Sequence, residues 1–285
     1  MNLVTVVGHY VSTLKHQLEH YAPYVDDVFV NVHRNSLTDE EYEKVVQITK
    51  DFGCGIHKEV EFENYNWNRV TDTYNETKLL KPDEWWIIAD DDELHHYQNP
   101  IQDIVDNCED NNWKFVTGAF LDRFSIDGSL NKVTDDKPLD EQFPLGGWFR
   151  FIVSNNCPNK VVLSKGEVQV SSGQHYALIG DKEVRTTENS RIASGVNHEY
   201  RCPVDWEFTQ VHHFKWDDTV VNKLNEIVKV DEPYAYSFEY DTLREYFEFH
   251  ENKINIKDPN FRVENVFENK NYSQWDFIKK TSLHF

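Results

Sequence analysis

The chain has 285 residues, of which 39% are hydrophobic and 14% aromatic, enough to build a sizeable core and to exclude a disordered chain. Lys and Arg total 29 against 50 Asp and Glu, which gives a formal net charge of −21. A surface of that sign repels nucleic acid and anionic membranes at long range, so neither is an expected partner. It also repels phosphorylated ligands, and a phosphate-binding site would therefore need a local cation.

The cysteines and the N-terminus bear on the cellular compartment. The four cysteines follow no C-x-x-C spacing, and Met1-Asn2 leads directly into a predicted strand, which leaves no room for a targeting segment. No apolar run approaches the ~20 residues that a membrane span requires. We therefore expect reduced thiols, no membrane span and a cytoplasmic location.

The first 120 residues alternate between apolar strand patterns and amphipathic helix patterns. Strands are predicted to begin near residues 3, 27, 55, 84 and 113, which is one β-α unit about every 28 residues. Helical patterns lie between them, at about residues 14–21, 39–50, 68–80 and 100–108. This rhythm predicts an α/β fold with a doubly wound, mostly parallel central sheet and helices on both faces.

The rhythm changes after residue 122, where turns and short strands become frequent. We predict strands at residues 148–153, 161–163, 168–170 and 208–216, a loop-rich stretch at 173–201, and helices at 219–228 and 243–251. Aromatic residues at the density of the C-terminal tail need burial, so the tail is expected to pack on the sheet. We predict a single domain over residues 1–285, with a nucleotide-binding half at 1–121, a mixed acceptor-side half at 122–230 and a helical, aromatic extension at 231–285.

The most informative stretch is Trp85-Trp86-Ile87-Ile88-Ala89 followed by Asp90-Asp91-Asp92-Glu93. An unbroken apolar run is typical of a strand buried on both faces, as in the middle of a parallel sheet. The acids then lie at the carboxyl end of a central strand, where open α/β sheets bind ligands. Adjacent carboxylates make one another costlier to ionise unless a cation is present, and Mg²⁺ or Mn²⁺ suits their oxygens. The alternative is a solvated acidic turn in an acidic protein.

Side-chain alternation along strands gives two further expectations. It places Asp90 and Asp92 on one side of an extended strand end and Asp91 on the other, with Glu93 anchoring the loop or a metal-bound water. It also turns the rings of two adjacent late histidines to opposite faces, so that only one of them can point into a site.

A parallel sheet that ends in Asp-x-Asp-Glu resembles the GT-A glycosyltransferases, which use such a motif to hold Mg²⁺ or Mn²⁺ against the diphosphate of a nucleotide sugar. The second half of the chain carries further segments in order: Leu121-Asp122-Arg123-Phe124 with Asp127-Gly128, Glu141-Gln142-Phe143-Pro144, Lys160-Val161-Val162 with Ser171-Ser172-Gly173-Gln174-His175, and Val211-His212-His213-Phe214-Lys215-Trp216. Together these segments are similar to the family-2-type glycosyltransferases of bacteria, algae and viruses, over about residues 1–230.

The resemblance implies transfer of a sugar from a UDP- or GDP-sugar to a hydroxyl of a glycan or another acceptor, with Mn²⁺ or Mg²⁺ as cofactor. Asp92 is then the main metal ligand, Asp90 contacts the ribose or the metal, and Asp91 belongs to the donor-binding set. GT-A enzymes often draw a metal or diphosphate ligand from a late histidine, which favours His213 over His212.

Other donor contacts follow from the same resemblance. Family-2 enzymes often carry Arg-Asn on the helix before the metal strand, whereas here Asn75 follows Tyr74. Arg69, one and a half turns earlier, is therefore the candidate for the missing cation. His175, beside a glycine in a turn-rich segment, is a candidate for contact with the donor phosphate or the acceptor hydroxyl.

The ends of the first two strands are candidates for nucleotide recognition. Gly8 lets the backbone approach a ligand closely, so that His9 and Tyr10 would flank the base. Asn31 and His33 follow at the end of the second strand and would read the edge of the base. The alternative is that these are ordinary loop residues.

An inverting transfer requires a carboxylate that deprotonates the acceptor hydroxyl, and two residues are candidates. Asp122 ends the strand that we expect beside the metal strand, and Glu141 lies in the expected acceptor-side loop. Because an Asp followed by Arg is more often part of a structural ion pair, Glu141 is favoured.

Competing functions use similar residues. A metal-dependent phosphohydrolase or nuclease would use the same carboxylates and histidines, but the acidic charge argues against nucleic acid, and no H-x-x-E-H or H-E-x-x-H motif is present. A sugar nucleotidyltransferase would need a Gly-rich, basic loop after the first strand, and Gly8-His9-Tyr10-Val11-Ser12 is neither. No EF-hand spacing supports a non-catalytic divalent-ion module.

Overall fold

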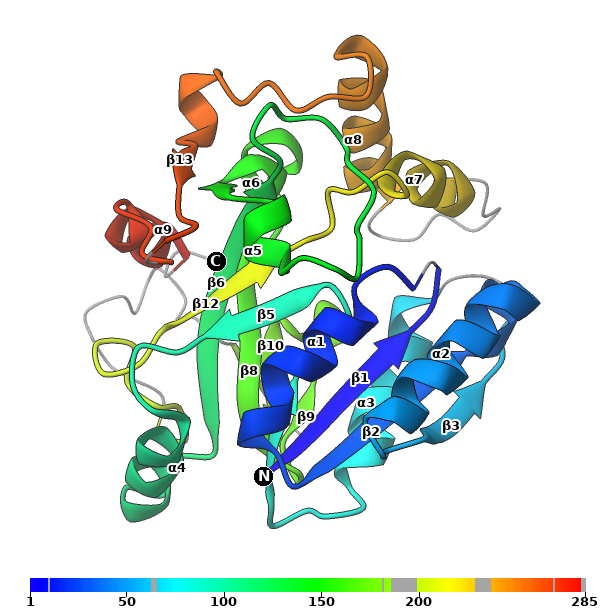
Figure 1. Cartoon of the computed structure of the whole chain (residues 1–285). Coiled ribbons are helices and arrows are strands. Elements are labelled where there is room, and N and C mark those ends of the chain that lie inside the picture. Colours follow the sequence, from blue (N-terminus) through cyan, green and yellow to red (C-terminus); the bar gives the residue numbers. More distant parts are fainter. Residues whose placement is uncertain are drawn as a thin grey trace. The chain divides into compact units, whose positions relative to one another are not determined.

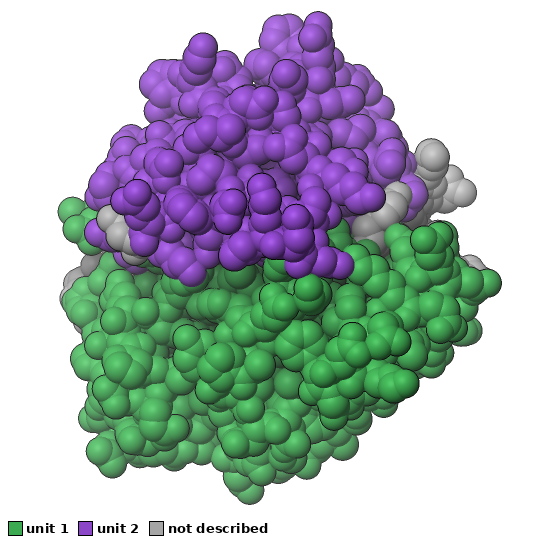
Figure 2. Space-filling view, in the orientation of Figure 1, with its two compact units in different colours: residues 1–120, 158–211, 276–285 green, residues 121–157, 212–275 purple. Residues whose placement is uncertain are grey.

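The computed structural model describes residues 1–9, 11–62, 66–180, 182–185, 199–228, 237–268 and 270–282. The chain forms two compact units, coloured separately in Figure 2. Unit 1 comprises residues 1–120, 158–211 and 276–285, and unit 2 comprises residues 121–157 and 212–275. Residues 158–211 therefore fold with the N-terminal part of the chain, although the sequence grouped them with the acceptor-side half.

Unit 1 alternates strands and helices through its first segment (Figure 1). Its elements in chain order are β1 (Asn2–Val7), α1 (Leu14–Tyr21), β2 (Asp27–His33), α2 (Asp39–Asp51), β3 (Ile56–Val60), α3 (Trp67–Lys78), β4 (Trp85–Ile88), β5 (Glu93–His96), α4 (Ile101–Asp110), β6 (Phe115–Phe124), β8 (Asn159–Lys165), β9 (Gln169–Val170), β10 (Tyr176–Ile179), β11 (Lys182–Arg185) and β12 (Thr209–His213). Strands β6 and β12 continue into unit 2. The predicted α/β fold class is confirmed, and each of the five predicted strand starts lies within two residues of an observed one.

The main sheet of unit 1 has the strand order β3-β2-β1-β4-β8-β6. β1 pairs in parallel with β2 and β4, and β2 pairs in parallel with β3, whereas β8 runs antiparallel to both β4 and β6. β6 therefore points the same way as β4 without being its neighbour. The expectation that Asp122 ends the strand beside the acidic run was wrong, because β8 lies between the two strands.

The connections reverse direction between β1 and β4. From β1 the chain proceeds through β2 to β3 on one side, and α3 then carries it back to β4 on the other side of β1. Open α/β sheets bind their ligands outside the carboxyl ends of the strands at such a switch point. In unit 1 that point lies between the end of β1 and the end of β4.

Helices cover both faces of this sheet, as predicted. Leu3 and Ile87 belong to a core that includes buried residues of α1, α2 and α4, while Val4 and Ile88 belong to a second core with residues of α3. Figure 1 shows α1 and α2 in front of the parallel strands and α3 behind them. Because both faces of β4 are covered, its five-residue apolar run needs no polar alternation.

Unit 2 contains α5 (Leu139–Gln142), β7 (Leu145–Gly147), α6 (Phe149–Ser154), α7 (Val220–Val228), α8 (Ser237–Phe249) and β13 (Glu264–Asn265), whereas α9 (Trp275–Ser282) belongs to unit 1 except for its first residue. The strand predicted at residues 148–153 was wrong, because this segment is helix α6. Phe149 is buried among Phe124, Trp216 and Phe261, and burial of this kind overrides local strand preference. The Asp122 carboxylate also accepts the Arg150 N–H in the first turn of α6, at 2.8 Å.

Other parts of the chain differ less from expectation. Strand β5, directly after the acidic run, was not predicted, and β13 pairs antiparallel with β7 instead of lying across a sheet face. Of the loop-rich stretch predicted at residues 173–201, residues 176–179 and 182–185 form strands β10 and β11, and residues 181 and 186–198 lie outside the described residues, as does Tyr10. None of the described helices is long and apolar enough to cross a membrane.

Lys78 generates a prediction about pH and stability. Its side chain is fully buried on α3, where the ammonium donates to the carbonyl of Val168, and burial lowers the pKa of Lys78 to about 7. Between pH 7 and about 10 the unfolded chain therefore binds more protons than the folded one, and the free energy of unfolding rises by up to about 1.4 kcal/mol per pH unit. Lys78→Met should abolish this rise.

Urea unfolding of the wild type and the variant at pH 7, 8 and 9 tests this expectation. Lys58→Met, at an exposed lysine paired with Glu76, is the matched control and should keep the wild-type slope. An unchanged slope in Lys78→Met would contradict the assignment.

Candidate functional site

The acidic run forms a closed turn at the carboxyl end of β4. The strand ends at Ile88, and Asp91 and Asp92 form a turn that leads into β5. The Glu93 N–H donates to the Asp90 carbonyl at 3.0 Å, and the Asp90 N–H donates to the Glu93 carboxylate at 3.3 Å. The expected alternation of Asp90 and Asp92 along an extended strand end was wrong, because the backbone turns at Asp91.

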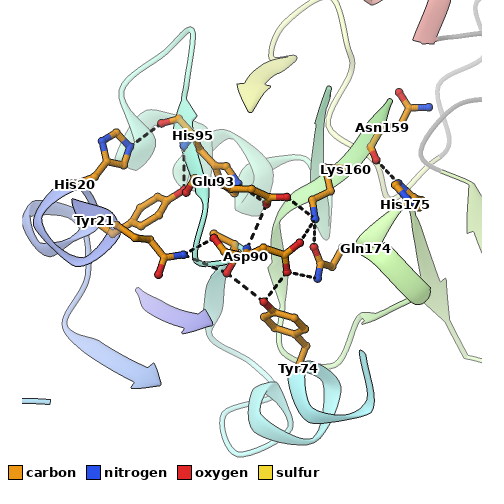
Figure 3. A network of polar contacts seen from close by, with 12 residues as sticks. His20, Tyr21, Tyr74, Asp90, Glu93, His95, Asn159, Lys160, Gln174 and His175 are labelled. Carbon is orange, nitrogen blue, oxygen red and sulfur yellow. Dashed lines mark hydrogen bonds and ion pairs between the residues drawn. The ribbon is translucent and has the colours of Figure 1, made fainter. Parts of the chain in front are cut away.

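The Asp90 carboxylate lies in a hydrogen-bond network built from three other segments (Figure 3). The Tyr74 hydroxyl donates to Asp90 Oδ1 at 2.7 Å, and Gln174 Nε2 donates to the same oxygen at 3.1 Å. Lys160 Nζ donates to Asp90 Oδ2 at 2.9 Å and lies 2.8 Å from Glu93 Oε1. Lys160 also donates to Gln174 Oε1. One lysine of β8 therefore joins two of the four acids.

The electrostatics of this network favour charged forms. Burial alone would raise the pKa of Asp90, but the Lys160 ammonium and the hydrogen bonds from Lys160, Tyr74 and Gln174 hold it well below its ordinary value. Burial likewise opposes the charge on Lys160, yet the Asp90 and Glu93 carboxylates raise its pKa above the ordinary value. The Asp90 carboxylate and the Lys160 ammonium therefore stay ionised at neutral pH.

Helix α1 supports the turn from the other side (Figure 3). Gln17 Nε2 donates to the Asp90 carbonyl at 2.6 Å, and the Tyr21 hydroxyl donates to the Glu93 carbonyl at 3.2 Å. The Tyr21 oxygen in turn accepts the His95 N–H at 2.9 Å. Backbone groups of the turn and of β5 are thus held by buried side chains, which fixes the turn in one conformation.

Helix α3 differs from the expected donor-binding helix. Tyr74, at the place of the arginine in the family pattern, holds Asp90 through its buried hydroxyl. Asn75 donates to the Val170 carbonyl at 2.9 Å and accepts the Val170 N–H at 2.8 Å, so its amide secures β9. Arg69 is exposed, and the cation beside Asp90 is Lys160. The donor-binding assignments of Arg69 and Asn75 stay predictions.

The ends of β1 and β2 bring the nucleotide-binding candidates together. A Cβ at Gly8 would lie 2.8 Å from Ser36 Oγ and 3.0 Å from His33 Cβ, so a side chain at this position would require its neighbours to shift. The rings of His9 and His33 meet edge to face at 5.7 Å, and His33 stacks on Phe62 at 3.7 Å. Burial lowers the pKa of His33, which favours a neutral ring at neutral pH.

Asn31 and His175 are tied to backbone groups. Asn31 is fully buried and donates to the Thr5 carbonyl at 3.2 Å, which places it within the sheet. His175 Nδ1 lies 2.6 Å from the Asn159 carbonyl, and its ring is buried. Their roles toward a ligand stay predictions.

In unit 2, Asp122 is a buried carboxylate with three donors. It accepts the Arg150 N–H at 2.8 Å and the Trp216 Nε1–H at 2.9 Å, and His213 Nδ1 lies 3.2 Å from its Oδ1. A carboxylate at Nδ1 fixes the tautomer of His213 and leaves Nε2 as the nitrogen with a lone pair. The assignment of His213 as a metal ligand stays a prediction.

Arg123 organises a second buried cluster in unit 2. Its guanidinium donates to Asp140 Oδ1 at 2.6 Å, to the Phe143 carbonyl at 2.7 Å and to His212 Nδ1 at 2.6 Å. Burial lowers the pKa of His212 to about 3, so the ring is neutral. The ion pair expected within the Asp-Arg dipeptide therefore forms with Asp140, while Glu141, next to it, is exposed.

The acids of the turn differ in their surroundings. Asp90 and Glu93 contact the Lys160 ammonium, and Asp92 is a half-buried carboxylate of the same turn. Mg²⁺ and Mn²⁺ accept one or two protein carboxylates and complete their shell with phosphate oxygens and water. The assignment of Asp92 as the main metal ligand stays a prediction.

Sequence reasoning missed Lys160, Tyr74 and Gln174 as parts of this site. The signal for Lys160 was a single cation that opens the apolar run Val161-Val162-Leu163 of β8. A lysine in such a strand must find a carboxylate, because burial without a partner is costly. Which carboxylate it meets depends on the strand order, which the sequence pattern did not predict.

No family model and no curated protein sequence matches the chain. Among solved structures, the chain is similar to S. aureus TarS, with a TM-score of 0.33 and 9% identity over 87% of this chain and 43% of that one. A structure of S. aureus TarS 1-349 gives a TM-score of 0.33 and 10% identity, over 87% of this chain and 72% of that one. The structure of a putative glucose-1-phosphate thymidylyltransferase from Bacillus anthracis gives a TM-score of 0.29 and 8% identity, over 99% of this chain and 95% of that one. Similarity at this level identifies neither a substrate nor a reaction.

The cluster around Arg123 gives a prediction about stability. Arg123→Met removes the donors to the Asp140 carboxylate and to the Phe143 and Leu145 carbonyls, and we expect it to lower the free energy of unfolding by about 3–5 kcal/mol. Arg34→Met, at a pair whose aspartate partner is 95% exposed, should change it by less than about 1 kcal/mol. Urea unfolding measures both variants, and equal effects would show that the buried cluster contributes no more than a surface pair.

Proposed function

We propose that the chain is a metal-dependent glycosyltransferase that moves a sugar from a nucleoside-diphosphate sugar, a UDP- or GDP-sugar, to a hydroxyl of a glycan or another acceptor. The observation that carries the proposal is the position of the acidic turn. The residues from Asp90 to Asp92 follow β4, and Gly8 and His9 follow β1, so the two groups flank the switch point of the parallel strands. Nucleotides bind at this place in doubly wound sheets.

The residues at the ends of the parallel strands suit the parts of such a donor. His9 is half-buried, and its ring meets the buried ring of His33, which stacks on Phe62, so His9 is the ring that would contact the base. Asp92 would hold a Mn²⁺ or Mg²⁺ ion. That ion supplies neutralisation of the negative charge that develops on the leaving diphosphate. The network around Asp90 keeps the turn in place before the donor arrives.

The acceptor side is assigned to residues of unit 2. Glu141 is an exposed carboxylate, 3.9 Å from Lys137, and is free of the buried contacts that hold Asp122. We propose Glu141 as the base that removes the proton of the acceptor hydroxyl, with Asp122 as the second candidate. A phosphohydrolase acting on the same donor would cleave the P–O–P bond and release a nucleoside monophosphate and a sugar 1-phosphate, whereas a glycosyltransferase releases the nucleoside diphosphate.

The first prediction is that binding of a nucleoside diphosphate depends on a divalent cation. Calorimetric titration of UDP and GDP should show at least about tenfold tighter binding in Mn²⁺ than in EDTA, because the diphosphate otherwise approaches an acidic turn. Asp92→Asn should remove this difference, while Asp39→Asn, at an exposed surface pair, should keep it. Equal affinity in Mn²⁺ and EDTA would remove the metal from the mechanism.

The second prediction separates the two candidate bases. Glu141→Gln should leave donor binding unchanged and reduce transfer by about 10²–10⁴-fold, the usual contribution of a positioned base. Asp122→Asn should mainly lower the melting temperature, because it weakens the cap of α6. The measurements are donor affinity, transfer rate and melting temperature of both variants. If Asp122→Asn stays folded and loses transfer while Glu141→Gln remains active, the roles are reversed.

A further inference from the structure

Lys160 has an environment that a surface lysine never has. It lies on β8, is 1% exposed, and its ammonium is surrounded by three oxygen atoms (Figure 3). These are Asp90 Oδ2 at 2.9 Å, Glu93 Oε1 at 2.8 Å and Gln174 Oε1. The ammonium donates hydrogen bonds to Asp90 and Gln174 and forms an ion pair with Glu93.

The Asp90 and Glu93 carboxylates both contact the Lys160 ammonium. Glu93 is 1% exposed, and a carboxylate that deep is stable only beside a cation. Asp90 is 30% exposed, but its other oxygen already accepts hydrogen bonds from Tyr74 and Gln174. The two carboxylates and the Lys160 ammonium together carry a net charge of −1, whereas the carboxylates alone would carry −2. An ion held at the turn would therefore meet the smaller charge.

A divalent ion on Asp90 would compete with this arrangement. It would have to lie against the Lys160 ammonium, and like charges a few ångströms apart repel strongly where water is excluded. It would also displace hydrogen bonds that Asp90 accepts from Tyr74, Gln174 and Lys160. The acidic run is therefore divided into an inner pair, Asp90 and Glu93, and an outer pair, Asp91 and Asp92.

We propose that Lys160 is a built-in counter-cation that keeps divalent ions off the Asp90–Glu93 pair and holds the acidic turn in its ligand-binding shape without metal. Lys160 is a positioning residue, since it acts through Asp90 and Glu93. The inference rests on the proposed function only where it leaves the donor-linked ion to Asp92. The effect of Lys160 on divalent-ion binding and on the stability of the turn can be measured without any nucleotide.

The test replaces the ammonium by an apolar group of similar length. Lys160→Met should melt at a lower temperature than the wild type in EDTA, because two buried carboxylates lose their cation. Mn²⁺ alone should raise its melting temperature and should bind, by calorimetry without nucleotide, at least about tenfold more tightly than to the wild type. Lys165→Met, at the half-buried last residue of the same strand where the lysine pairs with Glu109, is the matched control and should gain no Mn²⁺ affinity.

A triple variant separates charge balance from simple packing. Asp90→Asn, Glu93→Gln and Lys160→Met together remove all three charges and retain the approximate volume. The triple variant should regain much of the melting temperature lost in Lys160→Met and should lose the gain in Mn²⁺ affinity. If Lys160→Met folds only with Mn²⁺ present, the ion has taken the place of the ammonium, which supports the proposal.

Two results would overturn it. One is that wild type and Lys160→Met bind Mn²⁺ equally and that Asp90→Asn removes the ion from the wild type, since Asp90 would then be a metal ligand beside Lys160. The other is a triple variant as unstable as Lys160→Met. Neither measurement contains a nucleotide, so failure of the glycosyltransferase proposal, seen as absence of UDP and GDP binding, is recognised separately.

Discussion

The buried charge balance between Lys160 and the acids that follow β4 is the constraint on which unit 1 depends. A central strand that is apolar on both faces and ends in four carboxylates brings negative charge into a poorly hydrated region. Asp90 and Glu93 can stay ionised there because an ammonium lies within 3 Å of each of them. With the turn fixed by these contacts, the ends of β1 and β4 present one defined edge to a ligand.

The position of β8 in the sheet explains how Lys160 reaches the acidic turn. β8 is the one antiparallel strand between β4 and β6, and it is also the strand that carries Lys160. In a continuous parallel order β6 would lie next to β4, and the cation of β8 would not reach Asp90. The insertion that contradicted the expected strand order is therefore what supplies the acidic turn with its cation.

The sequence predicted what depends on local pattern and failed where distant segments meet. The five strand starts and the helices on both faces follow from periodicity, and the acidic run was recognised as the centre of the chain. The partner of Asp90 lies 70 residues away on β8, and the partner of Arg123 is Asp140, not the adjacent Asp122. The strand predicted at residues 148–153 was wrong for a related reason, since this segment is helix α6 and the burial of Phe149 depends on residues from three other segments. Pairings of this kind follow from the fold and leave little trace in spacing.

The distribution of cations also bears on function. The protein has only 29 Lys and Arg, and several of them are committed to internal contacts: Lys160 to Asp90 and Glu93, Arg123 to Asp140, and Arg150 to Glu239. Cations used in this way stabilise turns and helices, but they are not exposed to attract a diphosphate. Under the proposed function, a chain of net charge −21 would bind a nucleotide sugar at an acidic turn, and a divalent ion that arrives with the donor would supply positive charge there. An ion on Asp92 would leave the contacts of Lys160 with Asp90 and Glu93 undisturbed.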